Sequence, residues 1–218
     1  MNKLLCPSMM CADFGNLAGE VTALEAAGAD MFHLDMMDGQ FVPNFGMGLQ
    51  DVEYICKKAT IPCDVHLMIQ RPGDYVEKFA ALGAQVIYIH PETDVHAART
   101  LQKIIDAGAQ PGIAINPGTA FATVEPLLNL VQYILVMTVN PGFAGQKYIP
   151  FVEEKIDQLL AAKFKDRYNF KVMIDGACSP YVIQRMSAKG VEGFILGTSA
   201  LFGKGRPYTD IMPELRAL

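Results

Sequence analysis

The strongest constraint on this chain is a regular alternation of short apolar runs with amphipathic stretches. A short apolar run bounded by turn residues is typical of a buried strand, and apolar residues three or four positions apart are typical of a helix. The eight predicted strands cover residues 4–8, 31–35, 63–68, 85–90, 112–116, 132–138, 170–175 and 193–197. The predicted helices between them cover residues 16–27, 51–58, 74–82, 97–107, 120–130, 150–163 and 180–188.

This repetition predicts an α/β fold, a single (β/α)8 TIM barrel that occupies residues 1–218 as one domain. The alternative is a doubly wound open sheet, which normally carries a GxGxxG motif after its first strand. Residues 4–16 contain no such motif. The barrel directs attention to the carboxyl ends of the strands, because the active sites of such folds lie there.

Composition narrows the range of partners. The net charge is −5 and no basic run occurs, so nucleic acid is not an expected partner. The apolar segment 127–139 is too short to cross a bilayer and contains Asn129 and Gln132, which argues against membrane association. The five cysteines form no CxxC pair, and Pro7 and Asp13 interrupt the apolar start that a signal peptide would need. These features predict a cytoplasmic protein with reduced thiols.

The second predicted strand carries ionisable groups on one face. Side chains two positions apart on a strand share a face, so His33, Asp35 and Met37 point to the same side. A buried carboxylate and a buried imidazole need partners, because unpaired buried polar groups are costly. Either a hydrogen bond between the two or a shared metal ion would satisfy them.

The third predicted strand repeats the pattern, with Asp64, His66 and Met68 on one face. A further carboxylate, Asp175, ends the seventh predicted strand. Two inward histidines with nearby carboxylates are typical of a divalent-metal site, and Zn²⁺, Fe²⁺, Mn²⁺ and Co²⁺ all suit such ligands. Asp64 lies deeper, so we expect it to orient an imidazole. The predicted ligands of one ion per subunit are His33, Asp35, His66 and Asp175.

Small residues follow the last three predicted strands. They form the segments Asn140-Pro-Gly142-Phe143-Ala144-Gly145, Gly176-Ala177 and Gly197-Thr198-Ser199. Small residues let backbone N–H groups approach an oxyanion, and residues 197–202 are expected to open a short helix whose dipole favours phosphate. A single glycine more often makes a turn. Three clusters at one rim, where barrels usually bind phosphate, predict a phosphate site.

A metal site and a phosphate site in one barrel suggest a phosphorylated ketose as the substrate. A divalent cation polarises a carbonyl and stabilises the enediolate that forms when the neighbouring carbon loses its proton. Asp35 and Asp175, on opposite sides of that carbon, could remove a proton from one face and return one to the other. Met37, Met68 and Met137 would line the site and keep water from the enediolate.

Five motifs in a fixed order extend this interpretation over essentially the whole chain. They are His33-Leu-Asp35-Met-Met-Asp-Gly39, His66-Leu-Met68, Met137-Thr-Val-Asn-Pro-Gly-Phe-Ala-Gly-Gln146, Ile174-Asp175-Gly176 and Gly197-Thr-Ser-Ala-Leu-Phe202. Together they resemble the ribulose-phosphate 3-epimerase family. The resemblance implies a (β/α)8 barrel, one catalytic divalent metal ion on the four predicted ligands, Asp35 and Asp175 as acid and base, and a homo-oligomer. The residues expected to contact the substrate are Ser8, Met37, His66, Met68, Met137, Gly142, Phe143, Ala144, Gly145, Asp175, Gly176, Ala177, Gly197, Thr198 and Ser199.

Several positions depart from the pattern of the ribulose-phosphate enzymes. Thr138, Ala144 and Thr198-Ser199, with His90-Pro-Glu-Thr93, look more like the branch of the family that acts on D-allulose 6-phosphate. The resemblance therefore favours conversion of D-allulose 6-phosphate to D-fructose 6-phosphate. The alternative is conversion of D-ribulose 5-phosphate to D-xylulose 5-phosphate, because a pocket discriminates only weakly against one extra carbon.

Two different classes of protein also compete with this interpretation. A metal-free phosphosugar barrel, such as those of tryptophan biosynthesis, would leave the two inward histidines unexplained. A non-catalytic phosphosugar-binding barrel could keep the three glycine clusters, but it would not need Asp35 and Asp175 together.

Overall fold

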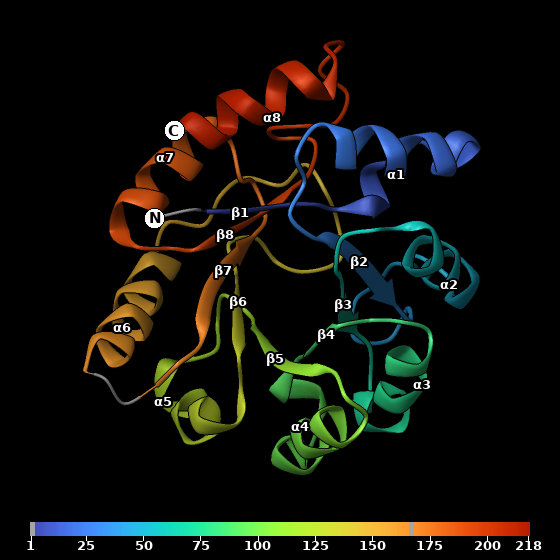
Figure 1. Cartoon of the computed structure of the whole chain (residues 1–218). Helices are drawn as coiled ribbons and strands as arrows, with labels where there is room; N and C mark the ends of the chain where they lie inside the picture. The colour runs from blue at the N-terminus through green and yellow to red at the C-terminus, as the bar shows by residue number, and fades with distance from the viewer. Residues whose placement is uncertain (1–2, 166–167) are drawn as a thin grey trace.

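A computed structural model describes residues 3–165 and 168–218. Eight parallel strands form one sheet in the order β1-β8-β7-β6-β5-β4-β3-β2, and a parallel bridge between Ser8 and His33 joins the two end strands. The strands are β1 (Leu4–Pro7), β2 (Phe32–Met37), β3 (Cys63–Met68), β4 (Val86–Ile89), β5 (Gln110–Ile115), β6 (Tyr133–Met137), β7 (Lys171–Asp175) and β8 (Gly193–Leu196). The sheet thus curls into a nearly closed ring with the helices outside it (Figure 1), which confirms the predicted (β/α)8 barrel.

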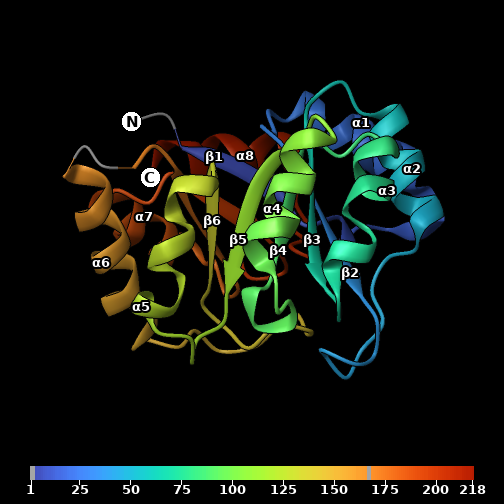
Figure 2. The same ribbon diagram turned by 90° about the horizontal axis from the view of Figure 1, so that it is seen from below.

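An α-helix follows every strand along the described chain. The helices are α1 (Leu17–Ala26), α2 (Leu49–Lys58), α3 (Val76–Ala81), α4 (Ala97–Asp106), α5 (Phe121–Val124), α6 (Val152–Phe164), α7 (Pro180–Lys189) and α8 (Tyr208–Ala217). Seen from the side, the loops that follow β2 and β6 gather at the same edge of the barrel (Figure 2). Within the described ranges, no helix has both the length and the apolar character needed to cross a bilayer.

Two predicted helix boundaries were wrong and one helix was not predicted, each for an identifiable reason. The helix predicted over residues 120–130 stops after α5 and continues as a 3₁₀ helix, Glu125–Leu130, because Pro126 has no N–H to donate and its ring crowds the preceding turn. Helix α2 begins before Asp51, whose carboxylate accepts a hydrogen bond from Gly48 N at 2.8 Å and so caps the first turn. Helix α8 was not predicted, and it contains Pro213, which masks its helical signal.

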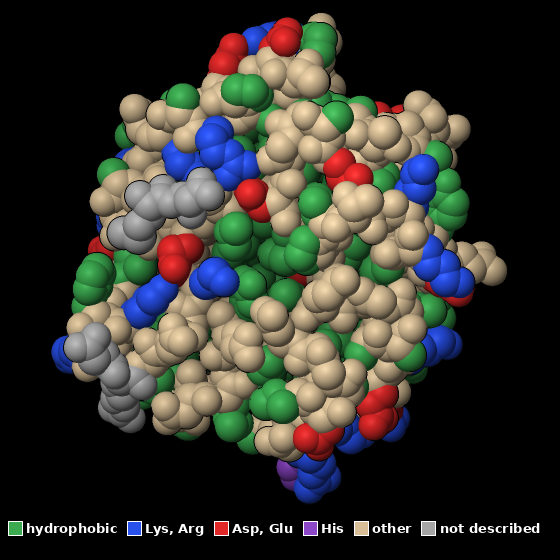
Figure 3. All heavy atoms as spheres, viewed as in Figure 1, with side chains coloured by type: hydrophobic (Ala, Val, Ile, Leu, Met, Phe, Trp, Pro, Cys, Tyr) green, Lys and Arg blue, Asp and Glu red, His purple; other side chains and the backbone are tan. Residues whose placement is uncertain are grey.

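Apolar side chains fill both sides of the strands. Outward residues of the strands pack against the helices in the main core, as Leu34 and Val65 do, and both are fully buried. Inside the ring, a second cluster closes the end of the barrel where the strands begin; it includes Met31, Tyr88, Tyr133 and Met173. Figure 3 views the barrel from this end, and apolar side chains gather at its centre. The interior is therefore a packed core beneath the opposite rim.

Candidate active site and metal centre

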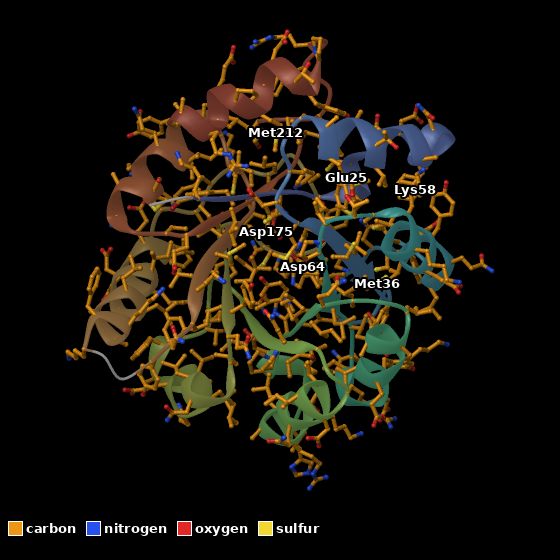
Figure 4. All side chains as sticks on the ribbon, viewed as in Figure 1. Glu25, Met36, Lys58, Asp64, Asp175 and Met212 are labelled. Atoms are coloured by element: carbon orange, nitrogen blue, oxygen red, sulfur yellow. The ribbon has the colours of Figure 1, made fainter. Side chains whose placement is uncertain are left out.

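The register between β2 and β3 assembles the polar centre of the barrel. His33 lies opposite Asp64, and Asp35 lies opposite His66 in the parallel pairing. Each imidazole therefore has a carboxylate beside it on the neighbouring strand, on the face that points into the ring. Figure 4 shows Asp64 and Asp175 within the ring of strands, whereas Met36, from the other face of β2, lies outside it.

Four side chains bring one ligand atom each within 4.8 Å of the others: His33, Asp35, His66 and Asp175. Asp35 Oδ1 lies 3.2 Å from His33 Nε2 and 3.3 Å from His66 Nδ1. His66 Nδ1 lies 3.9 Å from Asp175 Oδ2. These are the four predicted ligands, and they come together from three different strands.

The surroundings of the cluster fit a divalent cation. His33 Nε2 is buried and makes no hydrogen bond within the described residues, so this nitrogen has an unused lone pair or proton directed at the cluster. The other ring nitrogen, His33 Nδ1, lies 2.5 Å from Asp64 Oδ1. A carboxylate behind a ligating histidine fixes its tautomer and strengthens it as a ligand. Two imidazoles and two carboxylates form a donor set that suits Zn²⁺, Fe²⁺, Mn²⁺ or Co²⁺.

Burial and mutual charge shift the pKa values of the cluster in different directions. Burial alone would raise the pKa of Asp35, but the charge of His33 and the close contacts with both imidazoles hold it well below its usual range. Burial raises the pKa of Asp175 to about 7, and the charge of Asp35 adds to this effect. Burial lowers the pKa of His66 to about 4. Without a cation, Asp35 is therefore ionised and the His66 ring is neutral at neutral pH.

One pocket opens above the cluster at the carboxyl ends of the strands. Of the residues predicted to contact the substrate, all except His66 line it, namely Ser8, Met37, Met68, Met137, Gly142, Phe143, Ala144, Gly145, Asp175, Gly176, Ala177, Gly197, Thr198 and Ser199. Asp35 also lines the pocket, whereas His33 and His66 are fully buried. The Ser8 hydroxyl donates a hydrogen bond to Asp35 Oδ2 at 2.6 Å, which fixes the orientation of that carboxylate.

The loops after β6 and β7 require unusual backbone conformations. Gly142 and Gly176 have φ values of 114° and 107°, and a Cβ on Gly176 would come within 2.5 Å of Val139 Cγ2. Asn44, in the loop after β2, donates a hydrogen bond from Nδ2 to the Gly142 carbonyl at 2.7 Å. Glycine is thus needed for both the left-handed conformation and the close approach, and two loops meet over the pocket.

The predicted short helix after β8 does not form. Residues 198–203 make turns, in which the N–H groups of Leu201 and Phe202 converge on the Gly197 carbonyl at 3.0 and 3.3 Å. Such a tight turn carries no aligned helix dipole. Any anion binding at Gly197, Thr198 and Ser199 would therefore depend on their individual backbone N–H groups and hydroxyls.

Several residues of the site were not predicted. Met10, Cys11, Cys178 and Ile195 also line the pocket. His90 lies behind His66, with the two Nε2 atoms 2.8 Å apart. Its position at the end of the fourth predicted strand was a signal that could have found it, because the other inward histidines also lie near strand ends.

The sequence matches known proteins over almost its whole length. The profile of the ribulose-phosphate 3 epimerase family matches residues 4–202. The chain is 40% identical to the ribulose-phosphate 3-epimerase of Aquifex aeolicus over 99% of this chain and 95% of that protein. It is 34% identical to the ribulose-phosphate 3-epimerase of Escherichia coli, over 98% of this chain and 95% of that protein.

Solved structures of more distant proteins share the fold. KGPDC from Streptococcus mutans superposes with a TM-score of 0.78 at 11% identity and covers 100% of this chain and 97% of that chain. A tryptophan synthase alpha-subunit from Pyrococcus furiosus gives a TM-score of 0.72 at 16% identity and covers 100% of both chains. These likenesses are evidence for the barrel alone. The family profile and the close relatives go further, and on them the chain belongs to the ribulose-phosphate 3-epimerase family.

Proposed function

We propose that this protein is an isomerase that inverts C3 of a ketose phosphate. The observation that carries the proposal is the meeting of two carboxylates, Asp35 and Asp175, at one ligand cluster on the pocket floor. They come from β2 and β7, which are separated around the ring by the strands β1 and β8. Carboxylates that approach from different directions can serve the two faces of one carbon, which inversion of a stereocentre requires.

The two carboxylates share the proton transfers. For a substrate with its C3 between them, one carboxylate removes the C3 proton and the other delivers a proton to the opposite face. The roles reverse in the reverse reaction, so each group acts as a base in one direction and as an acid in the other. A divalent cation held by His33, Asp35, His66 and Asp175 would supply positive charge for the oxyanion that develops at C2.

The remaining residues of the pocket bind and shield the substrate. Met37, Met68 and Met137 line the pocket beside the carboxylates, where their apolar side chains exclude water from the reacting carbons. The glycine-rich loop after β6, Gly176 with Ala177, and the turn at Gly197 supply small residues around the same pocket. We assign the phosphate of the substrate to this rim, because backbone N–H groups can approach an oxyanion closely there.

We propose D-ribulose 5-phosphate as the preferred substrate, with D-xylulose 5-phosphate as the product. The names of similar proteins support this choice, since the Aquifex aeolicus and Escherichia coli relatives are named ribulose-phosphate 3-epimerases. One of the positions that favoured D-allulose 6-phosphate carries little weight. Thr138 is fully buried, and its hydroxyl donates to the carbonyls of Asp175 and Gly176 beneath the pocket.

D-Allulose 6-phosphate stays a second candidate because Ala144, Thr198 and Ser199 line the pocket. These residues are in a position to contact a longer sugar phosphate. A single extra carbon changes the discrimination by a pocket only about 10- to 200-fold, so the two substrates must be compared quantitatively.

The test is a comparison of kcat/KM for the five-carbon and six-carbon ketose phosphates on protein of measured metal content. We expect turnover of both ketose phosphates to stop when a chelator removes the metal ion and to return when a divalent cation is added. A higher kcat/KM for D-ribulose 5-phosphate would support the preferred substrate, and a higher value for D-allulose 6-phosphate would reverse the choice. If the Asp35→Asn and Asp175→Asn proteins bind the substrate and still epimerise it, the assignment of both carboxylates is wrong.

Other properties of the protein stay predictions from the sequence and the resemblance. These are the identity of the metal ion, the homo-oligomeric state and the cytoplasmic location. Metal analysis of the purified protein and sedimentation equilibrium would test the first two directly.

A further inference from the structure

A second histidine lies directly behind the predicted metal ligand His66. His90 follows β4, is fully buried, and places its Nε2 2.8 Å from His66 Nε2. The other nitrogen of His66, Nδ1, faces Asp35 and Asp175. The ring of Phe41 covers His90, with a centroid separation of 4.7 Å. Among the described residues, His90 therefore reaches the cluster through His66 alone, and Phe41 shields it on the side of the loop after β2.

This contact restricts where the protons can lie. A ligating imidazole must present a lone pair to the cation, so Nδ1 of His66 must carry no proton when it binds a metal ion. The neutral ring then carries its proton on Nε2 and donates it to His90 Nε2. His90 in turn must carry its own proton on Nδ1.

Glu92 lies beside His90 and favours a proton on Nδ1 of that ring. Glu92 Oε2 lies 3.5 Å from His90 Nδ1, a buried nitrogen that makes no hydrogen bond within the described residues, and the side chain of Glu92 is 23% exposed. The other oxygen, Oε1, accepts hydrogen bonds from Asn116 N at 3.1 Å and from the Thr119 hydroxyl. The carboxylate is thus held by the segment after β5, and its negative charge favours a proton on the facing Nδ1 of His90.

We propose that His90 and Glu92 are positioning residues that keep His66 in the tautomer with a free Nδ1, ready to bind a divalent cation. The inference rests on the metal site of the proposed function. Carboxylate–histidine pairs behind a ligating histidine orient the ring and raise its basicity. Here a histidine is inserted between the carboxylate and the ligand, which carries the same control from the rim after β4 to the centre of the barrel.

The test measures Zn²⁺ affinity of the metal-free protein by isothermal titration calorimetry, without substrate. His90→Gln keeps a carbonyl oxygen that can accept from His66 Nε2–H, whereas His90→Leu has no acceptor. We expect His90→Leu to weaken Zn²⁺ binding about 10- to 100-fold and His90→Gln to recover most of this loss. The visible absorption of bound Co²⁺ should shift in His90→Leu and return toward the wild-type spectrum in His90→Gln, because the orientation of His66 differs.

Glu92 has a matched control on the same loop. Asp94 also accepts a hydroxyl hydrogen bond, from Thr100 at 2.5 Å, but in the part of the chain that the structure describes no side-chain hydrogen bond or ion pair joins it to His90. Glu92→Gln is expected to weaken Zn²⁺ binding about tenfold, and Asp94→Asn is expected to leave it unchanged. The two substitutions remove the same charge, so the comparison isolates the contact with His90.

The outcomes separate this inference from the proposed function. Equal Zn²⁺ affinity for wild type, His90→Leu and Glu92→Gln would overturn the positioning role. Equal losses in His90→Leu and His90→Gln would overturn it as well, because packing alone would then explain the effect. A wild-type protein that binds no divalent cation would instead refute the metal site of the proposed function.

Discussion

Asp64 offers the clearest measure of how the barrel core supports the ligand cluster. Its Oδ1 lies 2.5 Å from His33 Nδ1, and both side chains are fully buried. Asp64→Asn keeps a carbonyl acceptor but loses the charge, and Asp64→Leu removes the acceptor. A charge-assisted hydrogen bond is about twice as strong as a neutral one, so we expect Asp64→Asn to lower the free energy of unfolding by about 1 kcal/mol.

Asp64→Leu should be more damaging because it leaves a buried N–H of His33 without a partner. The loss of the hydrogen bond and the desolvated donor together predict a decrease of about 3 kcal/mol in the free energy of unfolding. Zn²⁺ binding should weaken about tenfold in Asp64→Asn and about 100-fold in Asp64→Leu. The second factor corresponds to about 2.8 kcal/mol of binding free energy.

Urea unfolding of the metal-free proteins gives the stabilities, with the slope m compared between variants to confirm that the unfolded states are similar. Calorimetric titration with Zn²⁺ gives the affinities. If Asp64→Leu bound Zn²⁺ as tightly as wild type, Asp64 would not orient His33 toward a cation. If the stability of Asp64→Leu were also unchanged, the buried hydrogen bond between Asp64 and His33 would contribute nothing to the stability of the fold.

Three further perturbations test other parts of the structure. Gly193→Ala would place a Cβ 2.1 Å from Met173 Sδ inside the barrel. We expect the free energy of unfolding, measured in urea, to fall by about 1–3 kcal/mol and to recover in part when Met173→Ala is added. Full stability of the single variant would contradict this packing. Asn44→Ala removes the hydrogen bond to Gly142, which contributes about 1 kcal/mol. Steady-state kinetics should show KM raised severalfold with little change in kcat. An unchanged KM would exclude a role for this hydrogen bond in substrate binding. Burial would raise the pKa of Glu92, but its interactions with His90 and with the hydroxyl of Thr119 hold it at about 2, below the ordinary 4.5. Since a depressed pKa stabilises the fold above the ordinary value, the stability difference between wild type and Glu92→Gln should be present near pH 6 and shrink as the pH falls from about 4.5 toward 2; a difference that does not depend on pH would refute this interaction.

The fold could be predicted from the sequence because each strand carries its own signal. The strands are short and apolar, and glycines such as Gly28 and Gly83 end the helices that precede them with positive φ. Helix boundaries were less predictable where a side chain competes with the backbone pattern. Pro126 converts the end of one predicted helix to a 3₁₀ helix, and the carboxylate of Asp51 extends another toward its start. Such effects depend on single hydrogen bonds, which periodicity does not record.

The ligand cluster could be predicted for a different reason. Strand alternation assigns His33, Asp35 and His66 to the inner face, and a barrel brings the carboxyl ends of its strands to one rim. The register between strands was not predictable, and it decides that Asp64 faces His33 and that Asp35 faces His66. Contacts such as the one between His66 and His90 depend on side-chain rotamers, for which the sequence pattern has no signal.

The most direct test of the central claim follows deuterium at C3 when the metal-loaded enzyme acts on D-ribulose 5-phosphate in deuterated water. A carboxylate on each face of the carbon, Asp35 on one and Asp175 on the other, predicts that the epimerised product carries a solvent deuteron at C3 while the metal-free protein labels neither sugar. Product that retains the original proton at C3 would mean that a single group moves it between the faces, and it would contradict the two-carboxylate account.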